Sequence, residues 1–263
     1  MKPIVAVVQA RLSSSRLPNK MLLDLAGKPV LARTLERVQA IPEVDTVILA
    51  TSTSDEDWPL LDLANELGVQ GYAGSLDDVL DRVYCAAKQA SAATIMRITG
   101  DCPLLDPAVC QEVLNVFKLG NADYVSNIRP PTYPDGLDSE VFSFEALEAA
   151  WQASTLSSDR EHVTQFLWTR PHRFRLANVE HQTDLSALRW TVDEPDDLEF
   201  VRQVYDSLFR NGHSGFSFLD VLDVIKKDEL QDSSIRFDRN EGQARSMHED
   251  GLDYAKSMER FER

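Results

Sequence analysis

The chain has 263 residues, of which 43% are hydrophobic, and this is enough for one large α/β domain with a well-buried core. Its 27 Lys and Arg residues are outnumbered by 43 Asp and Glu, and the net charge of -16 disfavours binding to nucleic acid. Three cysteines without CxxC spacing predict reduced thiols. Because we find no long apolar run and no signal-peptide pattern, we expect a soluble, cytoplasmic protein with no membrane partner.

The first predicted strand is the apolar run at residues 4–8, IVAVV, which is rich in β-branched residues. Such a run is typical of a strand buried on both faces of a parallel sheet. A polar loop follows, in which three cations, Arg11, Arg16 and Lys20, flank three serines. Ligands of open α/β sheets bind at the carboxyl ends of the strands, so we interpret this loop as a site for a polyanion such as a nucleoside triphosphate. The alternative is an ordinary solvated basic loop.

Short strands then alternate with amphipathic helices as far as residue 118. Strands are predicted at 46–51, 69–73 and 94–98, and helices from residue 29 and at 57–67, 77–90 and 106–118. This alternation indicates βαβ units, a parallel sheet and right-handed crossovers.

The pattern changes after a strand predicted at 123–127. Residues 129–138 are rich in proline and are expected to form a loop. Further strands are predicted at 139–142, 173–179 and 187–192, the last two as a candidate antiparallel pair, and helices at 145–152, 160–169, 195–209 and 218–227. We therefore expect one domain over 1–227 and a polar tail over 228–263, which is either disordered or a helix that needs a partner.

Two aspartates follow predicted strands at positions suited to a metal ion. Asp101 lies within RITGDCPLLD, and Asp193 lies within RWTVDEPDDL ahead of a helix. Mg²⁺ takes a small number of carboxylates together with phosphate oxygens and water, so this pair would complete a metal–triphosphate site facing the basic loop. The alternatives are that Asp193 caps the following helix and that Asp101 braces the turn before Pro103.

Six blocks of the sequence resemble a known family. In chain order they are QARLSSSRLPNKMLLDLAGKPVL, GSLDDVLDRVYCAA, RITGDCPLLDP, GLDSEVFS, REHVT and WTVDEPDDL. The first is similar to the N-terminal signature of cytidylyltransferases that activate acidic sugars, the acylneuraminate and 3-deoxy-manno-octulosonate type. The others look closest to the branch of the spore coat polysaccharide biosynthesis protein SpsF. The resemblance covers residues 1 to about 225, with all blocks in the family's order.

The resemblance implies a fold and a reaction. The fold is a single-domain nucleotide-diphosphosugar-transferase, Rossmann-like and GT-A-like, with a mixed, mostly parallel sheet flanked by helices. The reaction is transfer of CMP from CTP to a small-molecule acceptor, with Mg²⁺ as cofactor and release of pyrophosphate, in surface polysaccharide or related glycan biosynthesis. A homodimer is compatible with these features.

The resemblance also implies roles for individual residues. Arg11, Lys20 and Asp101 would be catalytic, and Asp101 and Asp193 would hold Mg²⁺. The implied nucleotide-binding residues are Ala10, Arg11, Ser13, Arg16, Lys20, Thr51, Gly74, Ser75, Asp78 and Arg82. Selection of cytosine is expected within 74–82, where a strand meets a helix. The alternative for Asp78 and Arg82 is an ion pair on a helix surface.

The GLDSE and REH blocks imply an acceptor site. Its residues would be Asp138, Glu140, Arg160, Glu161 and His162. Of these, His162 is a candidate base, with an exposed helix histidine as the alternative. The residues that grip a sugar carboxylate in acidic-sugar synthetases find no match, so a sugar, an acidic sugar and a phosphate or phosphonate all stay open as acceptors.

Two other classes of protein are weighed against this assignment. A glycosyltransferase of related fold would use a finished nucleotide sugar and usually carries an Asp-x-Asp motif, where this chain has Gly100-Asp101-Cys102-Pro103. A non-catalytic nucleotide-binding protein would not need Arg11, Lys20 or Asp101, and all three are present.

Overall fold

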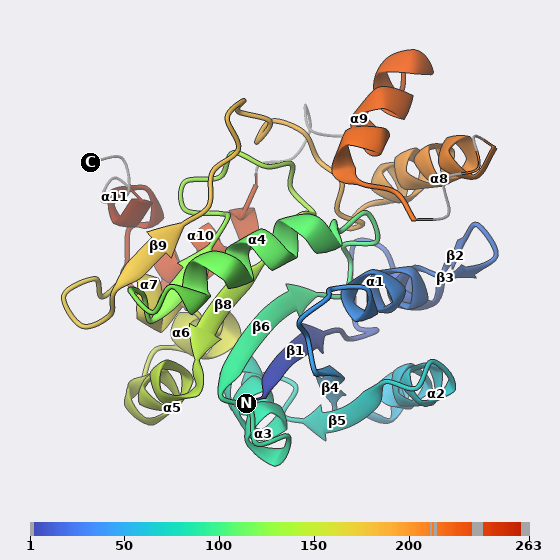
Figure 1. The fold of residues 1–263 in the computed structure, drawn as a ribbon. Coiled ribbons are helices and arrows are strands. Elements are labelled where there is room, and N and C mark those ends of the chain that lie inside the picture. Colours follow the sequence, from blue (N-terminus) through green and yellow to red (C-terminus); the bar gives the residue numbers. More distant parts are fainter. Residues whose placement is uncertain (1–2, 211, 213–214, 233–238, 259–263) are drawn as a thin grey trace.

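A seven-stranded sheet runs through the protein (Figure 1). The computed structural model describes residues 3–210, 212, 215–232 and 239–258. The strands are β1 (Ile4–Gln9), β4 (Thr46–Ser52), β5 (Gln70–Gly74), β6 (Thr94–Thr99), β7 (Tyr124–Ser126), β8 (Glu140–Ser143) and β9 (Leu176–Asn178), in the spatial order β5-β4-β1-β6-β8-β7-β9. A separate two-stranded ribbon pairs β2 (Asp24–Leu25) with β3 (Lys28–Pro29).

The strand directions confirm the mixed, mostly parallel sheet. Strand β1 pairs in parallel with β4 and β6, and β4 pairs in parallel with β5. Strand β8 is antiparallel to both β6 and β7, and β9 is parallel to β7. Six strands therefore end at the same edge of the sheet, and β8 begins there. In open α/β sheets this is the edge at which ligands bind.

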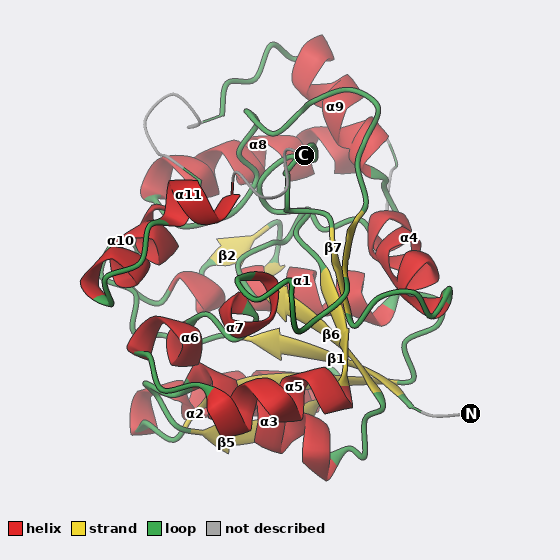
Figure 2. Cartoon of the chain, turned by 90° about the vertical axis from the view of Figure 1, so that its left-hand side faces the viewer, coloured by secondary structure: helices red, strands yellow, loops and turns green. Residues whose placement is uncertain are grey.

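Helices cover both faces of the sheet (Figures 1 and 2). They are α1 (Val30–Gln39), α2 (Trp58–Glu66), α3 (Val79–Gln89), α4 (Pro107–Lys118), α5 (Phe144–Ala153), α6 (Ser157–Glu161), α7 (Gln165–Trp168), α8 (Pro195–Arg210), α9 (Phe218–Lys227), α10 (Glu241–Glu249) and α11 (Tyr254–Met258). Successive strand residues point to opposite faces, and they divide the core accordingly. In β1, Ala6 and Val8 belong to the core that includes residues of α1, α4, α8 and α9, whereas Val5 and Val7 belong to the core that includes residues of α3, α5 and α7.

Two predicted elements are wrong. The helix expected at 160–169 is two short helices, α6 and α7, because Val163 between them has a left-handed backbone (φ 53°). The strand expected at 187–192, and with it the antiparallel pair, is replaced by a loop with one isolated bridge. Backbone groups of this segment form hydrogen bonds with other loops. The Trp190 N–H donates to the Asp135 carbonyl (2.7 Å), and the Val192 N–H donates to the Asp101 carbonyl (2.9 Å).

The end of the chain folds back onto the sheet. Of the predicted tail, residues 233–238 and 259–263 lie outside the described residues, and helices α10 and α11 follow the first gap. Met247 of α10 is fully buried in the core on the α3–α5 side, and the Ser158 N–H donates to Asp250 at 2.7 Å. The partner that a helix in this tail needs is therefore the rest of the same chain. In the part of the chain that is described, no helix is long and apolar enough to cross a bilayer.

Candidate active site

Lys20 lies between the two aspartates that the sequence singles out. It begins a short 3-10 helix after a left-handed Asn19. Its Nζ donates to Asp101 Oδ2 (2.7 Å), Asp193 Oδ1 (2.7 Å) and the Val192 carbonyl (2.9 Å), so all three of its protons are used. Burial lowers the pKa of Lys20, but the two aspartates outweigh that effect and the pKa is raised. Lys20 is therefore charged and fixed in position.

The side chain of Asp193 is directed at cations and does not cap the following helix. Asp197 takes the capping role, because its Oδ2 accepts the N–H groups of Asp193 and Glu194, each at 2.9 Å. Burial would raise the pKa of Asp193, but Lys20, Arg16 and Arg189 together lower it. The ion pairs to Arg16 and Arg189 are 3.1 and 3.2 Å long.

The loop that carries Asp101 is pressed against the first strand. A Cβ on Gly100 would lie 2.9 Å from Ala10 Cβ and 3.2 Å from the Gln9 carbonyl, so only glycine fits without a shift. The Asp101 carbonyl accepts the Val192 N–H, and this bond ties the two aspartate loops together. Asp101 and Asp193 thus converge although they are far apart in the sequence.

The aspartate pair suits a hard cation. Among the described residues, no group of three or more His, Cys, Asp and Glu side chains is arranged to hold a metal. Mg²⁺ at phosphate-transfer sites usually needs only one or two carboxylates, the remaining ligands being phosphate oxygens and water. The donor set of Asp101 and Asp193 therefore fits Mg²⁺, which would share these carboxylates with Lys20.

A second set of cations centres on Arg82. Arg82 of α3 is buried and donates to the Ser75 carbonyl at 2.9 Å. Burial first, and then the positive charges of Arg11 and Arg97, lower the pKa of Arg82 to about 10. Asp57 opposes this shift, and Arg97 is already paired with Glu140. A polyphosphate bound here would relieve the remaining repulsion between Arg11 and Arg82.

The other predicted nucleotide residues lie at the ends of β1, β4 and β5. Ala10 follows β1, and its N–H donates to the Ala50 carbonyl at 3.2 Å. Thr51 is fully buried, with a hydroxyl that lacks a hydrogen-bond partner. Gly74 ends β5, where an added Cβ would lie 3.1 Å from Arg82 Cγ. The backbone at this strand end thus approaches Arg82 closely.

Asp78 and Arg82 do not form the surface ion pair weighed above. Asp78 caps α3 by accepting the Asp81 N–H at 2.8 Å, and it pairs with Arg160 at 3.3 Å. The Ser75 hydroxyl accepts the Asp78 N–H at 3.0 Å. Of the remaining loop residues, Ser13 is exposed, and Arg16 pairs with Asp193 and Glu194.

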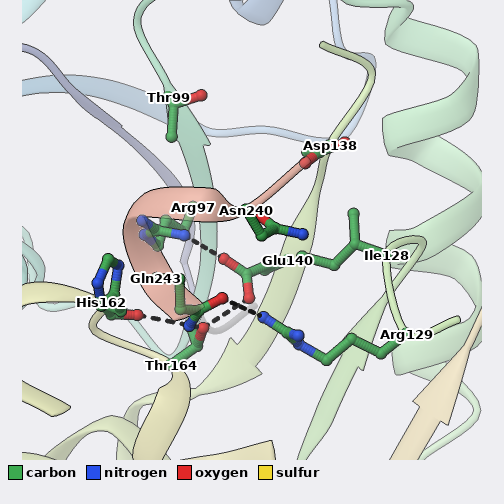
Figure 3. Close-up of a pocket in the computed structure, with 10 residues that line it drawn as sticks. All are labelled: Arg97, Thr99, Ile128, Arg129, Asp138, Glu140, His162, Thr164, Asn240 and Gln243. Atoms are coloured by element: carbon green, nitrogen blue, oxygen red, sulfur yellow. Dashed lines mark hydrogen bonds and ion pairs between the residues drawn. The ribbon is translucent and has the colours of Figure 1, made fainter. Parts of the chain in front are cut away.

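Two cavities open beside the aspartates. The larger, of about 370 Å³, is bordered by Asp101, Asp193, Arg189 and Arg245 among others. The smaller, of about 180 Å³, lies further along the sheet edge (Figure 3). Both are lined by Thr99, Asp138 and Asn240, so the two volumes adjoin.

Glu140 lines the smaller cavity and contacts several side chains around it. It begins β8 directly opposite Arg97 of β6, with which it forms an ion pair (Figure 3). Its other oxygen accepts the hydroxyls of Tyr124 and Thr164, each at 2.6 Å. Burial would raise the pKa of Glu140, but Arg97 and Arg129 lower it. Glu140 is therefore an ionised anchor with its acceptor sites occupied.

His162 lines the same cavity and is not an exposed helix histidine. Its side chain is 20% exposed, and its Nε2 lies 3.5 Å from Glu161 without hydrogen-bond geometry. Burial lowers the pKa of His162 to about 4, and the charges of Arg97 and Arg129 add to the shift. The imidazole is therefore neutral near pH 7 and is a weaker base than an ordinary histidine.

The five predicted acceptor residues do not all meet. Asp138, Glu140 and His162 line the smaller cavity, whereas Arg160 and Glu161 line neither cavity. Arg160 is occupied by the carbonyls of Trp151 (2.9 Å) and Ser154 (3.0 Å), which hold α6 against α5.

Several site residues escape the sequence reasoning. Arg97 had a usable signal, because a charge inside the buried run TIMRIT needs a reason. Arg189 makes a two-pronged ion pair with Asp197 (3.1 and 3.0 Å). Its role is not apparent from the sequence, because the segment around it is predicted to be a strand. Asn240 and Gln243 lie in the polar tail and give no signal at all.

Comparisons with known proteins agree with this geometry. The sequence model of a family described as cytidylyltransferase matches residues 5–213. An uncharacterised protein of Methanocaldococcus jannaschii is 36% identical over 224 residues, which are 79% of this chain and 91% of that protein. The spore coat polysaccharide biosynthesis protein SpsF of Bacillus subtilis is 27% identical over 212 residues, 78% of this chain and 87% of that one. The solved structure of a cytidylyltransferase from Leptospira borgpetersenii superposes with a TM-score of 0.82 at 27% identity, covering 91% of this chain and 99% of that one.

The family match spans most of the chain and includes the basic loop and both aspartate loops. The resemblance drawn from the six sequence blocks is thereby confirmed, as is the fold class. The chain belongs to the cytidylyltransferase family and is a CTP-dependent nucleotidyltransferase.

Proposed function

We propose that this enzyme transfers CMP from CTP, with Mg²⁺, to a small sugar-type acceptor and releases pyrophosphate. The observation that carries the proposal is the fixed Lys20 ammonium between Asp101 and Asp193. Arg16 of the basic loop pairs with Asp193, and both border the larger cavity, which has room for a small molecule. The acceptor is a sugar, an acidic sugar, or a compound with a phosphate or phosphonate group.

In the proposed reaction, an acceptor oxygen attacks the α-phosphorus of CTP. A new P–O bond to the acceptor forms, the bond from the α-phosphorus to the bridging oxygen breaks, and pyrophosphate leaves with that electron pair. Arg11, Arg16 and Arg82 would hold the triphosphate and stabilise the charge that develops on the leaving group. Mg²⁺ held by Asp101 and Asp193 would supply Lewis-acid stabilisation of phosphate charge.

The need for a base depends on the acceptor. A carboxylate or phosphate nucleophile is already ionised at neutral pH and gives up no proton. A hydroxyl nucleophile must lose one, and His162 is the candidate base that lines the smaller cavity, although its lowered pKa makes it a weak one. Lys20 has no free lone pair and keeps both aspartates oriented.

The test is a screen for pyrophosphate release, in which CTP, UTP, ATP and GTP are each combined with neutral sugars, acidic sugars, sugar phosphates and phosphonates. We expect release with CTP in the presence of one acceptor class, and at least about tenfold less with UTP, because a pocket built for the cytosine amine leaves an acceptor unpaired with uracil. The Asp101→Asn variant serves as the low-activity control. Preference for a purine nucleotide, or turnover only of a finished nucleotide sugar, would overturn the proposal.

The name of the Bacillus subtilis relative supports a role in surface polysaccharide or related glycan biosynthesis, which belongs to the same proposal.

A further inference from the structure

The smaller cavity is closed by a part of the chain that lies beyond the family match. That match ends at residue 213, whereas Asn240 and Gln243 line the cavity from residues 239–258, here termed the C-terminal segment. Figure 3 shows both side chains opposite Glu140 and Arg129. The wall that they form therefore lies outside the part of the chain that the family model matches.

The C-terminal segment is firmly attached to the site. Arg239 at its start pairs with Asp138 and donates to the Tyr133 carbonyl at 3.0 Å. At its far end, the ring of Tyr254 packs edge-on against Trp168, with 6.2 Å between centroids. Contacts at both ends, with Met247 fully buried between them, fix the wall in place.

Arg129 is the residue that this wall encloses. It follows the end of β7, its side chain lines the cavity, and only 3% of the residue is exposed. Its guanidinium stacks on Trp168 at 3.8 Å from the ring centroid. Its Nη2 donates to Gln243 Oε1 at 3.2 Å, while Nη1 lies 3.4 Å from the Met258 sulfur.

The partners of Arg129 are all neutral. Within the described residues, no carboxylate lies at ion-pair distance from it, and its buried Nε–H has no hydrogen-bond partner. Arg97 is already paired with Glu140, and Arg239 with Asp138. Glu140 and Asp138 therefore act on Arg129 only at longer range, and no carboxylate of the described chain is bonded directly to its guanidinium.

A buried guanidinium that no carboxylate contacts directly is only partly compensated, and its planar fork of donors matches an oxyanion with two or three oxygens. We propose that Arg129 binds an anionic group of the acceptor, a carboxylate or a phosphate or phosphonate, and that the C-terminal segment holds Arg129 for this purpose through Gln243. The assignment of the ligand to the acceptor rests on the proposed function. The oxyanion site itself does not depend on it.

The first experiment measures anion binding without nucleotide. In ¹⁵N-labelled full-length protein, the Arg129 Nε–H signal is identified by its proximity to the Trp168 ring and followed by NMR during titration. The probes are sodium phosphate, methylphosphonate and acetate, each compared with sodium chloride at equal ionic strength. Arg170 is the matched internal control, because it also stacks on an aromatic ring (Phe166, 3.8 Å) but is paired with Asp159.

We expect a saturable shift of the Arg129 signal with at least one oxyanion. At Arg170, the shift caused by each oxyanion should be no larger than the shift caused by sodium chloride. A larger response to phosphate and methylphosphonate would identify a phosphorylated group, and a larger response to acetate a carboxylate. Absence of a saturable shift with all three probes would overturn the proposal.

A second measurement tests the role of the segment. In Gln243→Ala the dissociation constant of the preferred anion should rise several-fold, and an unchanged constant would remove the C-terminal segment from the site. With a productive acceptor, Arg129→Lys should raise the acceptor KM by roughly tenfold, since the two-pronged contact is lost, and leave the KM for CTP unchanged. If anions bind but no acceptor yields pyrophosphate, the proposed function fails while the oxyanion site stands.

Discussion

At the scale of single residues, the site depends on charge compensation around Lys20. Two carboxylates that share one ammonium repel each other once it is removed. The Lys20 side chain is only 8% exposed, so water would screen that repulsion poorly. Lys20 therefore serves both the geometry of the site and the stability of the fold.

We expect Lys20→Ala to lower kcat/KM for CTP by about 10²–10³, the usual loss on removing one preorganised electrostatic donor. It should also lower the free energy of unfolding, because the buried carboxylates lose their partner. Steady-state kinetics and urea unfolding measure the two effects. The matched control is Lys28→Ala, which removes a half-exposed lysine paired with Glu36 and should change neither quantity appreciably. Near-normal turnover of Lys20→Ala would contradict the assigned role.

A second prediction concerns the cation. Asp101→Asn and Asp193→Asn each remove one hard anionic ligand, so the Mg²⁺ concentration for half-maximal activity should rise at least about tenfold in each variant. Titration of activity with MgCl₂ checks this. Asp196→Asn, in the exposed first turn of α8, is the control and should behave like wild type. If Asp193→Asn lowers only thermal stability and leaves the Mg²⁺ requirement unchanged, Asp193 is structural.

A third prediction follows from His162. In the folded protein its pKa is about 4, against 6.5 for the ordinary group, so between these values the unfolded chain binds more protons than the folded one. The free energy of unfolding should therefore fall as the pH is lowered from about 6.5 to about 4. Urea unfolding at pH 7 and pH 5 should show a smaller decrease for His162→Gln than for wild type. The exposed His172→Gln is the control and should retain the wild-type slope. Equal slopes for all three proteins would refute the buried, neutral state of His162.

At the scale of elements, the close approach of the loop around residue 136 to the loop at 190–191 requires a glycine. Gly136 has φ 108°, and a Cβ there would lie 2.7 Å from the Trp190 carbonyl carbon and 2.8 Å from the Thr191 nitrogen. Backbone atoms cannot move aside as a flexible side chain can. This close approach keeps Asp135 and Asp138 beside the loop that leads to Asp193.

Gly136→Ala should therefore destabilise the protein by about 1–3 kcal/mol more than Gly120→Ala, and it should lower activity. Gly120 also has positive φ (77°) but nothing within 4 Å of an added Cβ, so it isolates backbone strain from steric overlap. Urea unfolding of both variants gives the comparison. Equal losses would show that the contact with residues 190–191 is unimportant.

The elements also show which parts of the fold can be predicted from local sequence. The strands β1, β4 and β6 are predicted because runs of β-branched residues suffice for them, and the α4 boundary follows from the Asp106 cap and Pro107. The basic loop and both aspartates are singled out because each follows such a strand. The insertion of β8 between β6 and β7 is not predicted, since the Arg97–Glu140 pairing joins distant segments. For the tail, the sequence does not decide between disorder and a helix that needs a partner, because helix α10 buries only Gln243 and Met247.

At the scale of the whole molecule, the sheet brings the catalytic groups to one edge. The loop after β1, the loop after β6 and the first residue of β8 all lie there, and the C-terminal segment closes the edge from outside the family match (Figure 2). The chain carries a net charge of -16, yet Arg11, Arg82 and Arg97 gather at this edge. The cations are concentrated where a polyphosphate would bind.

The most direct test of the central claim is to follow the α-phosphate. Wild-type enzyme and Lys20→Ala are incubated with [α-³²P]CTP, MgCl₂ and a productive acceptor, and both labelled product and pyrophosphate are quantified. We expect the label to move from CTP to the acceptor with one equivalent of pyrophosphate per product, and Lys20→Ala to slow this transfer about 10²–10³-fold. Label that stays in CTP, or that appears only as free CMP whether or not acceptor is present, would contradict it.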